Sequence, residues 1–169
     1  TALAKRDVER LKRVLDDSPE ARLEAILAAT KRLENHAREL EAVRVGLRRL
    51  KGELHLLTAL ADLGGVWDLE QVTRALSRFA DAAVRVALAA AAAGEVAAGR
   101  LLAPKAASTR GPAPGLFVLA LGKHGGFELN YSSDIDISVF YAPEAMLTAG
   151  GADPQAVAVR LTPVLASIL

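Results

Sequence analysis

The sequence predicts an α+β protein, in which an N-terminal helical bundle precedes the first part of a mixed-sheet core of order βαβα, incomplete at the C-terminus. Apolar residues between positions 33 and 86 recur at helical spacing, which predicts the bundle. Three prolines fall between positions 104 and 114, and short apolar runs of strand length follow them. We therefore expect a helical region at 1–104, a linker at 105–114 and a partial core at 115–169.

Start and stop signals divide the predicted bundle into four helices. Residues 2–17 and 19–30 have the pattern of two short helices, with Ser18 as cap and Pro19 as first residue of the second. A long helix is expected from position 33 to the Gly64–Gly65 pair. Its apolar stripe consists of Leu33, Leu40, Val43, Leu47, Leu50, Leu54 and Leu57.

A fourth helix is expected to begin after Asp68, because Gln71 three residues later completes a capping box. A short turn joins it to the long helix, so the two should pack as an antiparallel hairpin with Trp67 plugging the turn. The apolar stripe of this fourth helix consists of Leu69, Val72, Leu76, Phe79, Ala83 and Val86.

Composition limits the classes of function. The chain has 169 residues, 51% of them hydrophobic, and no cysteine, so a packed core is expected and disulfides and thiolate metal sites are excluded. A net charge of +1 gives no basic footprint for nucleic acid. The longest apolar stretch, 86–94, is too short to span a membrane, and the charged start of the sequence does not have the pattern of a signal peptide.

The most informative segment is 115–141, GLFVLALGKHGGFELNYSSDIDISVFY. Residues 116–121 predict a buried strand, and Gly125 and Gly126 predict a turn whose backbone amides can approach a phosphate. Asp134 and Asp136 lie on a second apolar run, where residues two apart point to one side. Two such carboxylates can hold Mg²⁺ for a nucleotidyl transfer, and Lys123 adds a positive charge nearby.

The residues 122–136, GKHGGFELNYSSDID, resemble the signature of the bifunctional glutamine synthetase adenylyltransferase and adenylyl-removing enzymes, a family of the nucleotidyltransferase superfamily. The sequence Glu-Leu-Asn before Ser-Ser-Asp-Ile-Asp is typical of the family's N-terminal, adenylyl-removing domain. The segment 56–83 also resembles the helical lead-in to that domain. The core at 115–169 is thus expected to be part of a nucleotidyltransferase core.

The resemblance implies removal of AMP from a tyrosine of adenylylated glutamine synthetase by Mg²⁺-dependent phosphorolysis, with release of ADP. Gly125 and Gly126 would cradle phosphate, Asp134 and Asp136 would be the catalytic metal ligands, and Ser133 would border the nucleotide. The implied partners are adenylylated glutamine synthetase, ADP or ATP, phosphate and, through a parent enzyme, the PII signalling protein. A cytoplasmic location follows from the same family.

Two departures from the family pattern are visible. His124 stands where the family usually has leucine, and the third carboxylate that the superfamily carries on a later strand has no counterpart here. The only acids after Tyr141 are Glu144 and Asp153, and Asp153 has the pattern of a helix cap before Pro154. We therefore expect a piece of a longer enzyme that is inactive by itself.

Other interpretations remain open from the sequence. An isolated Asp-x-Asp pair is more often a solvated strand end, Gly-Gly more simply a tight turn, and Lys123 a surface lysine. The chain could be a helical interaction module with a degenerate nucleotide site, or part of a different nucleotidyltransferase. Arg48, Arg49 and Lys51 form a small basic cluster, a pattern that is more often a solvated helix face than a partner site.

Overall fold

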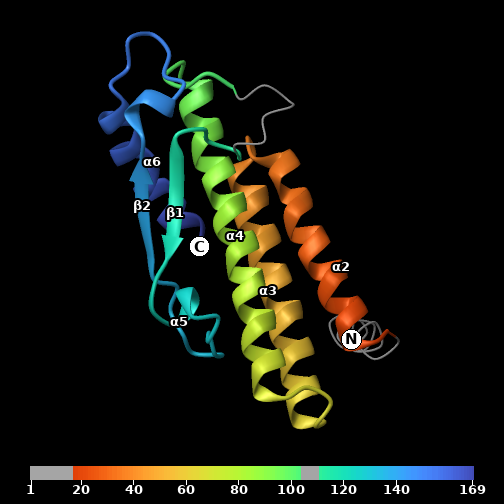
Figure 1. Cartoon of the computed structure of the whole chain (residues 1–169). Coiled ribbons are helices and arrows are strands. Elements are labelled where there is room, and N and C mark those ends of the chain that lie inside the picture. Colours follow the sequence, from red (N-terminus) through yellow and green to blue (C-terminus); the bar gives the residue numbers. More distant parts are fainter. Residues whose placement is uncertain (1–16, 104–110) are drawn as a thin grey trace.

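A computed structural model describes residues 17–103 and 111–169. Three long helices stand side by side, and a two-stranded hairpin with a last helix lies along one side of them (Figure 1). The elements in order are α2 (Pro19–Arg32), the 3₁₀ helix η1 (Leu33–His36), α3 (Leu40–Leu63), α4 (Leu69–Ala97), β1 (Leu116–Ala120), α5 (Gly122–Gly125), β2 (Ile137–Tyr141), the 3₁₀ helix η2 (Pro143–Ala145) and α6 (Pro154–Ile168).

This order confirms the predicted α+β class, with helices first and then the sequence β1, α5, β2, α6. The two strands pair antiparallel, with Leu116 opposite Tyr141 and Ala120 opposite Ile137. The expected helix at 2–17 and most of the expected linker at 105–114 fall outside the described residues.

Local capping chemistry explains where the helices begin. The Ser18 side chain accepts a hydrogen bond from the Ala21 amide before α2, as its position next to Pro19 predicted. Before α4, the Asp68 carboxylate accepts from the Gln71 amide at 2.8 Å, and the Gln71 side chain accepts from the Asp68 amide at 2.9 Å. The predicted capping box is therefore present.

The predicted long helix from position 33 is wrong at its N-terminal end. Leu33 belongs to η1, and α3 starts only at Leu40, after a turn in which Glu39 leaves the helical region. The Leu33 side chain folds back onto α3, where a Cβ on Gly46 would lie 2.7 Å from its Cδ2 atom. The seven-residue spacing from Leu33 to Leu40 thus joins two helices that pack against each other, not one face of a single helix.

The α3–α4 hairpin forms as expected, and Gly65 supplies the positive φ of its turn. Trp67 is buried at this turn and also reaches α2, because its Nε1 donates to the Glu20 carboxylate at 2.7 Å. This hydrogen bond is the main cause that lowers the Glu20 pKa. Leu69 is the exception in the predicted stripe of α4, since it lies in the first turn and is exposed.

The C-terminal half of α4 packs against α6. Small side chains such as Ala87, Ala90 and Ala91 are buried there, which allows α6 to come close with Val157 and Leu161. In the described part of the chain, no helix has both the length and the apolar character needed to cross a membrane. The alanine-rich run of α4 is buried, and α4 packs against α6.

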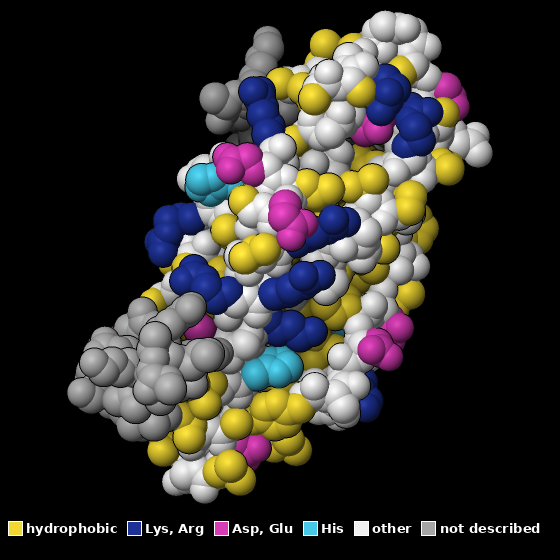
Figure 2. Space-filling view, turned by 180° about the vertical axis from the view of Figure 1, so that it is seen from behind, with side chains coloured by type: hydrophobic (Ala, Val, Ile, Leu, Met, Phe, Trp, Pro, Cys, Tyr) yellow, Lys and Arg dark blue, Asp and Glu magenta, His cyan; other side chains and the backbone are white. Residues whose placement is uncertain are grey.

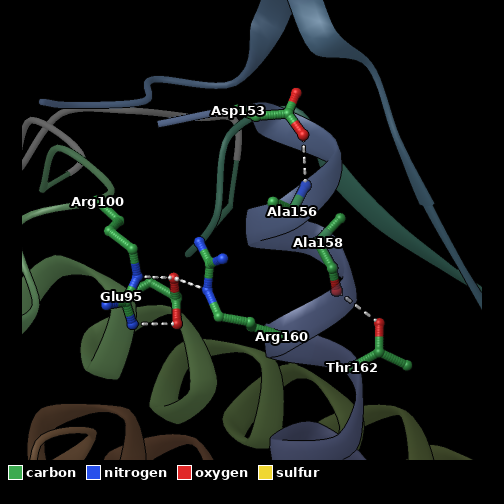
Figure 3. A network of polar contacts seen from close by, with 7 residues as sticks. All are labelled: Glu95, Arg100, Asp153, Ala156, Ala158, Arg160 and Thr162. Atoms are coloured by element: carbon green, nitrogen blue, oxygen red, sulfur yellow. Dashed lines mark hydrogen bonds and ion pairs between the residues drawn. The ribbon is translucent and has the colours of Figure 1, made fainter. Parts of the chain in front are cut away.

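A buried carboxylate fastens the end of α4 to α6 (Figure 3). Glu95 accepts two hydrogen bonds from Arg100, at 2.7 and 2.8 Å, and one from Arg160 of α6 at 3.4 Å. Hydrogen bonds from Arg100 hold the Glu95 pKa below its ordinary value. Backbone pairing of Leu102 with Leu147, at 2.8 Å, closes the same end of the molecule.

Replacing Glu95 by glutamine should lower the free energy of unfolding by about 1–3 kcal/mol, because the amide cannot accept the two charge-assisted hydrogen bonds of Arg100. Because folding lowers the Glu95 pKa, the difference between the wild-type protein and E95Q should be largest above the ordinary carboxyl pKa of 4.5 and shrink as pH falls further. Urea unfolding at several pH values measures this. The exposed Glu24, paired with Arg78 at 2.8 Å, provides the control, since E24Q should cost less than about 1 kcal/mol at every pH.

Candidate functional site

The two aspartates lie directly before β2 instead of within it. The strand starts at Ile137, and residues 133–136 form an extended segment that leads into it. The Leu121 amide donates to the Asp136 carbonyl at 2.8 Å, so backbone pairing continues one residue beyond the strands. The predicted second strand was therefore too long at its start, although its extended conformation reaches the acids.

Exposure alternates along this extended segment. Asp134 and Asp136 are exposed, whereas Ile135 and Ile137 are half-buried and pack against the core. In an extended chain, alternate side chains point to opposite sides, so the isoleucines fix which side the carboxylates take. Both acids therefore lie on the side away from the helical bundle.

Gly122 brings the turn after β1 against one of these carboxylates. It has a φ of +54°, and a Cβ placed on it would lie 2.9 Å from Asp136 Oδ2. Because Gly122 has no side chain, the Asp136 carboxylate can lie directly beside the turn. Sequence reasoning singled out Gly125 and Gly126 and missed Gly122, whose position directly after a strand was the available signal.

Gly125 and Gly126 have structural roles within the turn. Their amides already donate to the carbonyls of Leu121 and Gly122, each at 3.0 Å. A Cβ on Gly125 would lie 2.6 Å from the Ala120 carbonyl oxygen, so close packing of α5 on β1 is what requires glycine there. Binding of a phosphate by this turn stays a prediction.

Helix α4 holds the turn from the other side. His124 is buried, and its Nε2 lies 2.9 Å from the Asp81 carboxylate. The Leu129 amide donates a long hydrogen bond, 3.4 Å, to the hydroxyl of the buried Ser77. Ser77 and Asp81 are four residues apart, so they lie on one face of α4. The sequence signal for this anchor was a pair of polar residues within an otherwise apolar stripe.

Asn130 organises the loop before the acids. Its side-chain oxygen accepts from the Ser132 amide at 3.1 Å, from the Ser132 hydroxyl at 3.1 Å and from the Ser133 hydroxyl at 2.9 Å. The backbone amide of Asn130 donates to the Ser133 hydroxyl at 3.0 Å. Such local bonds are typical of asparagine and serine in turns, so Asn130 was detectable from sequence but was not assigned this role.

The remaining predicted site residues surround this turn. Lys123 is exposed on α5, and its carbonyl accepts from the Glu128 amide at 2.7 Å. The Glu128 side chain lies over Gly126, 3.6 Å from where a Cβ would be, so it shapes the turn. Ser133 is part of the Asn130 turn, directly before Asp134. The structure thus brings all six predicted site residues to one loop region between β1 and β2.

The two carboxylates suit a hard divalent cation. Within residues 17–103 and 111–169, neither Asp134 nor Asp136 forms an ion pair with a basic side chain. Mg²⁺ commonly takes only one or two protein carboxylates and fills its shell with water and phosphate oxygens. No group of three acidic or histidine side chains that could hold a metal occurs among the described residues. Carboxylate oxygens are of the type that Mg²⁺ prefers, and its binding by Asp134 and Asp136 stays a prediction.

The two acids after Tyr141, Glu144 and Asp153, lie in other elements than the Asp134–Asp136 segment. Glu144 belongs to η2, and the Asp153 carboxylate accepts from the Ala156 amide at 3.0 Å at the start of α6 (Figure 3). The predicted helix cap is confirmed.

We expect Asp81→Ala to loosen the glycine turn, because it leaves the buried His124 imidazole without its hydrogen-bond partner, a loss of about 1–3 kcal/mol. Amide exchange in residues 122–129 should become faster, while the exchange of α2 and α3 changes little. The double variant D81A/H124L should recover much of the protection, since leucine, the usual residue of the family, needs no partner. Equal exchange in the wild-type protein and D81A would contradict the anchoring role.

Comparisons with known proteins show the family of the chain. The family model described as glutamate-ammonia ligase adenylyltransferase matches residues 1–169. A bifunctional glutamine synthetase adenylyltransferase/adenylyl-removing enzyme from Caulobacter vibrioides is 56% identical over 99% of the chain, and enzymes of the same name from Bradyrhizobium sp. strains ORS 278 and BTAi1 are 48% and 44% identical over 99% of it. The chain spans 17% of the length of each of these three relatives.

No solved structure matches the chain. With the family model covering every residue and relatives above 40% identity, the chain belongs to the glutamate-ammonia ligase adenylyltransferase family.

Proposed function

We propose that the chain is part of an enzyme that removes AMP from adenylylated glutamine synthetase by Mg²⁺-dependent phosphorolysis and so regulates nitrogen assimilation. The observation that carries the proposal is the pair of exposed carboxylates, Asp134 and Asp136, the second of which lies beside Gly122. The names of the relatives, which give both adenylyl transfer and adenylyl removal, support glutamine synthetase as the protein substrate.

The removing activity is favoured over the transferring one by the signature itself. The residues Glu128, Leu129 and Asn130 precede Ser-Ser-Asp-Ile-Asp, the wording that resembles the family's adenylyl-removing domain. In the structure two of these residues have clear tasks, since Leu129 is buried against α4 and Asn130 holds the turn before the acids. The signature therefore corresponds to the residues that position the aspartates.

In the proposed reaction, an oxygen of inorganic phosphate forms a bond to the phosphorus of the AMP group. The bond from that phosphorus to the tyrosine oxygen breaks, the tyrosine hydroxyl regains a proton, and ADP leaves. Asp134 and Asp136 would hold Mg²⁺, which neutralises negative charge on the reacting phosphate oxygens when bound. Lys123 would add positive charge on the same side, and Ser133 would keep the acids next to the nucleotide.

The proposal extends to the cellular context of the family. ADP or ATP and phosphate would be the small-molecule ligands, the PII protein would act through the longer enzyme, and the location would be cytoplasmic. We further propose that residues 1–169 alone are inactive, because two carboxylates are fewer than the three of the superfamily's catalytic set. Membership of this family argues against a different nucleotidyltransferase.

The metal-binding role is tested in the full-length enzyme with Asp134→Asn and Asp136→Asn. Each substitution should reduce release of ADP from adenylylated glutamine synthetase to below about 1% of the wild-type rate, because a neutral amide is a poor ligand for Mg²⁺. Glu144→Gln, at an exposed acid beyond the opposite end of β2, should leave the rate unchanged. Near-normal rates in both aspartate variants would support the interaction-module alternative.

Gly122→Ala separates backbone strain from damage to the site. It places a Cβ 2.9 Å from Asp136 Oδ2 and should displace this carboxylate, so we expect turnover to fall at least about tenfold. Gly151 is a matched control, since its φ is +71° but nothing lies within 4 Å of a Cβ placed there. G151A should have a similar loss of thermal stability without the loss of turnover. Equal turnover in G122A and G151A would show that the Gly122–Asp136 contact is dispensable.

A further inference from the structure

We propose that a groove between α3, α4, the C-terminal end of α6 and the Asn130–Ser133 turn docks an acidic segment of the protein substrate. This inference rests on the proposed function and adds a binding surface beside the site. Figure 2 shows Lys and Arg side chains in a row that ends at a histidine, next to a hollow of hydrophobic side chains. The groove is lined on its basic side by Arg48, Lys51 and His55 of α3 and on its apolar side by Leu54, Leu76 and Phe79.

Two basic side chains of this groove have no acidic partner among residues 17–103 and 111–169. Arg48, Lys51 and His55 follow one another at intervals of three and four residues, so they share one face of α3. In the part of the chain that the structure describes, neither Arg48 nor Lys51 has an ion pair, although both are exposed. Their neighbour Arg49, by contrast, points to Glu53 at 3.9 Å.

The fixed charge comes from Arg48 and Lys51. Burial, with a smaller contribution from Lys51, holds the His55 pKa below its ordinary value, so the imidazole is neutral at neutral pH. His55 instead contacts the Tyr131 ring edge to face, with ring centres 6.1 Å apart. At the other end of the row, Arg44 donates to the Ser167 hydroxyl of α6 at 2.7 Å and is thereby held in place.

The size of the hollow favours a polypeptide over a small molecule. Its volume is about 140 Å³. Pockets that enclose small-molecule ligands usually measure about 300–1,000 Å³. A hollow this small suits one inserted apolar side chain, while the open basic row can pair with carboxylates along the rest of a segment. The complement is therefore a segment with an apolar anchor and flanking acidic residues.

The groove lies next to the segment that carries the candidate site. Asn130, Ser133 and Ile135 line it, and Ile135 lies between Asp134 and Asp136 in the sequence. Because Ile135 faces the bundle while the acids face away, one extended segment separates the groove from the carboxylates. A protein substrate seated in the groove is held close to the site, which lowers the entropic cost of presenting its modified tyrosine. We therefore assign the groove to a segment of glutamine synthetase next to that tyrosine.

The test uses the full-length enzyme with the double charge reversal Arg48→Glu/Lys51→Glu. The KM for adenylylated glutamine synthetase should rise about tenfold or more, with kcat changed by less than about twofold, because the lost contacts hold the substrate equally before and during the reaction. The KM of the wild-type enzyme should also increase with salt concentration more steeply than that of the variant. Biolayer interferometry with immobilised adenylylated glutamine synthetase should show the same loss of affinity.

The matched control is Lys31→Glu/Arg32→Glu, which makes the same change in charge at exposed positions of α2 and should leave KM and kcat unchanged. An unchanged KM in R48E/K51E would overturn the proposal. A lower melting temperature and lower kcat at unchanged KM would also overturn it, because another segment of the enzyme would then occupy the groove. A wild-type enzyme that neither binds nor turns over adenylylated glutamine synthetase would refute the proposed function, and the groove assignment with it.

Discussion

The rest of the structure depends on the burial of α4. This helix packs against α2, α3 and α6, so apolar and small side chains cover most of its circumference. A two-stranded hairpin has little stability in water by itself, and β1 and β2 are such a pair among the described residues. The order of the site is therefore supplied by α4, through its apolar packing and through a few polar side chains placed within it.

Those polar side chains divide α4 by function. Ser77 and Asp81 hold Leu129 and His124 of the site loop, whereas Glu95, about four turns beyond Asp81, binds Arg100 and Arg160. Ser77 and Glu95 are buried, and a buried polar group is costly unless it is hydrogen-bonded, whereas Asp81 is exposed and the buried member of its pair is His124. Ser77, Asp81 and Glu95 each have a hydrogen-bond partner outside α4. These directional bonds fix how the neighbouring segments sit on α4 more specifically than apolar contacts alone would.

The parts of the fold that local chemistry determines were predictable from sequence. The caps at Ser18, Asp68 and Asp153 follow from side chain and spacing within four residues. Long-range contacts were not predictable in the same way. Leu33 packs back on Gly46, and Asp81 contacts His124, which is 43 residues further along the chain. The motif gave the candidate site residues, which all fall between β1 and β2, but it did not predict where β2 begins. β2 begins at Ile137, and the last backbone hydrogen bond at this end of the hairpin joins the Leu121 amide to the Asp136 carbonyl, so the acids lie just before the strand.

The extended segment before β2 links the two surfaces of interest. Alternation of side chains makes Ile135 part of the bundle and its groove while Asp134 and Asp136 take the opposite side. A shift of one residue in the pairing of this segment would exchange the two sets, burying carboxylates and exposing isoleucine. The register is fixed by the bond from Leu121 to Asp136 and by the Asn130 turn. The positions of the Asp134 and Asp136 carboxylates and of Ile135 in the groove wall therefore depend on the same few backbone and turn contacts. A change that weakens these contacts is expected to displace the carboxylates and the groove wall together.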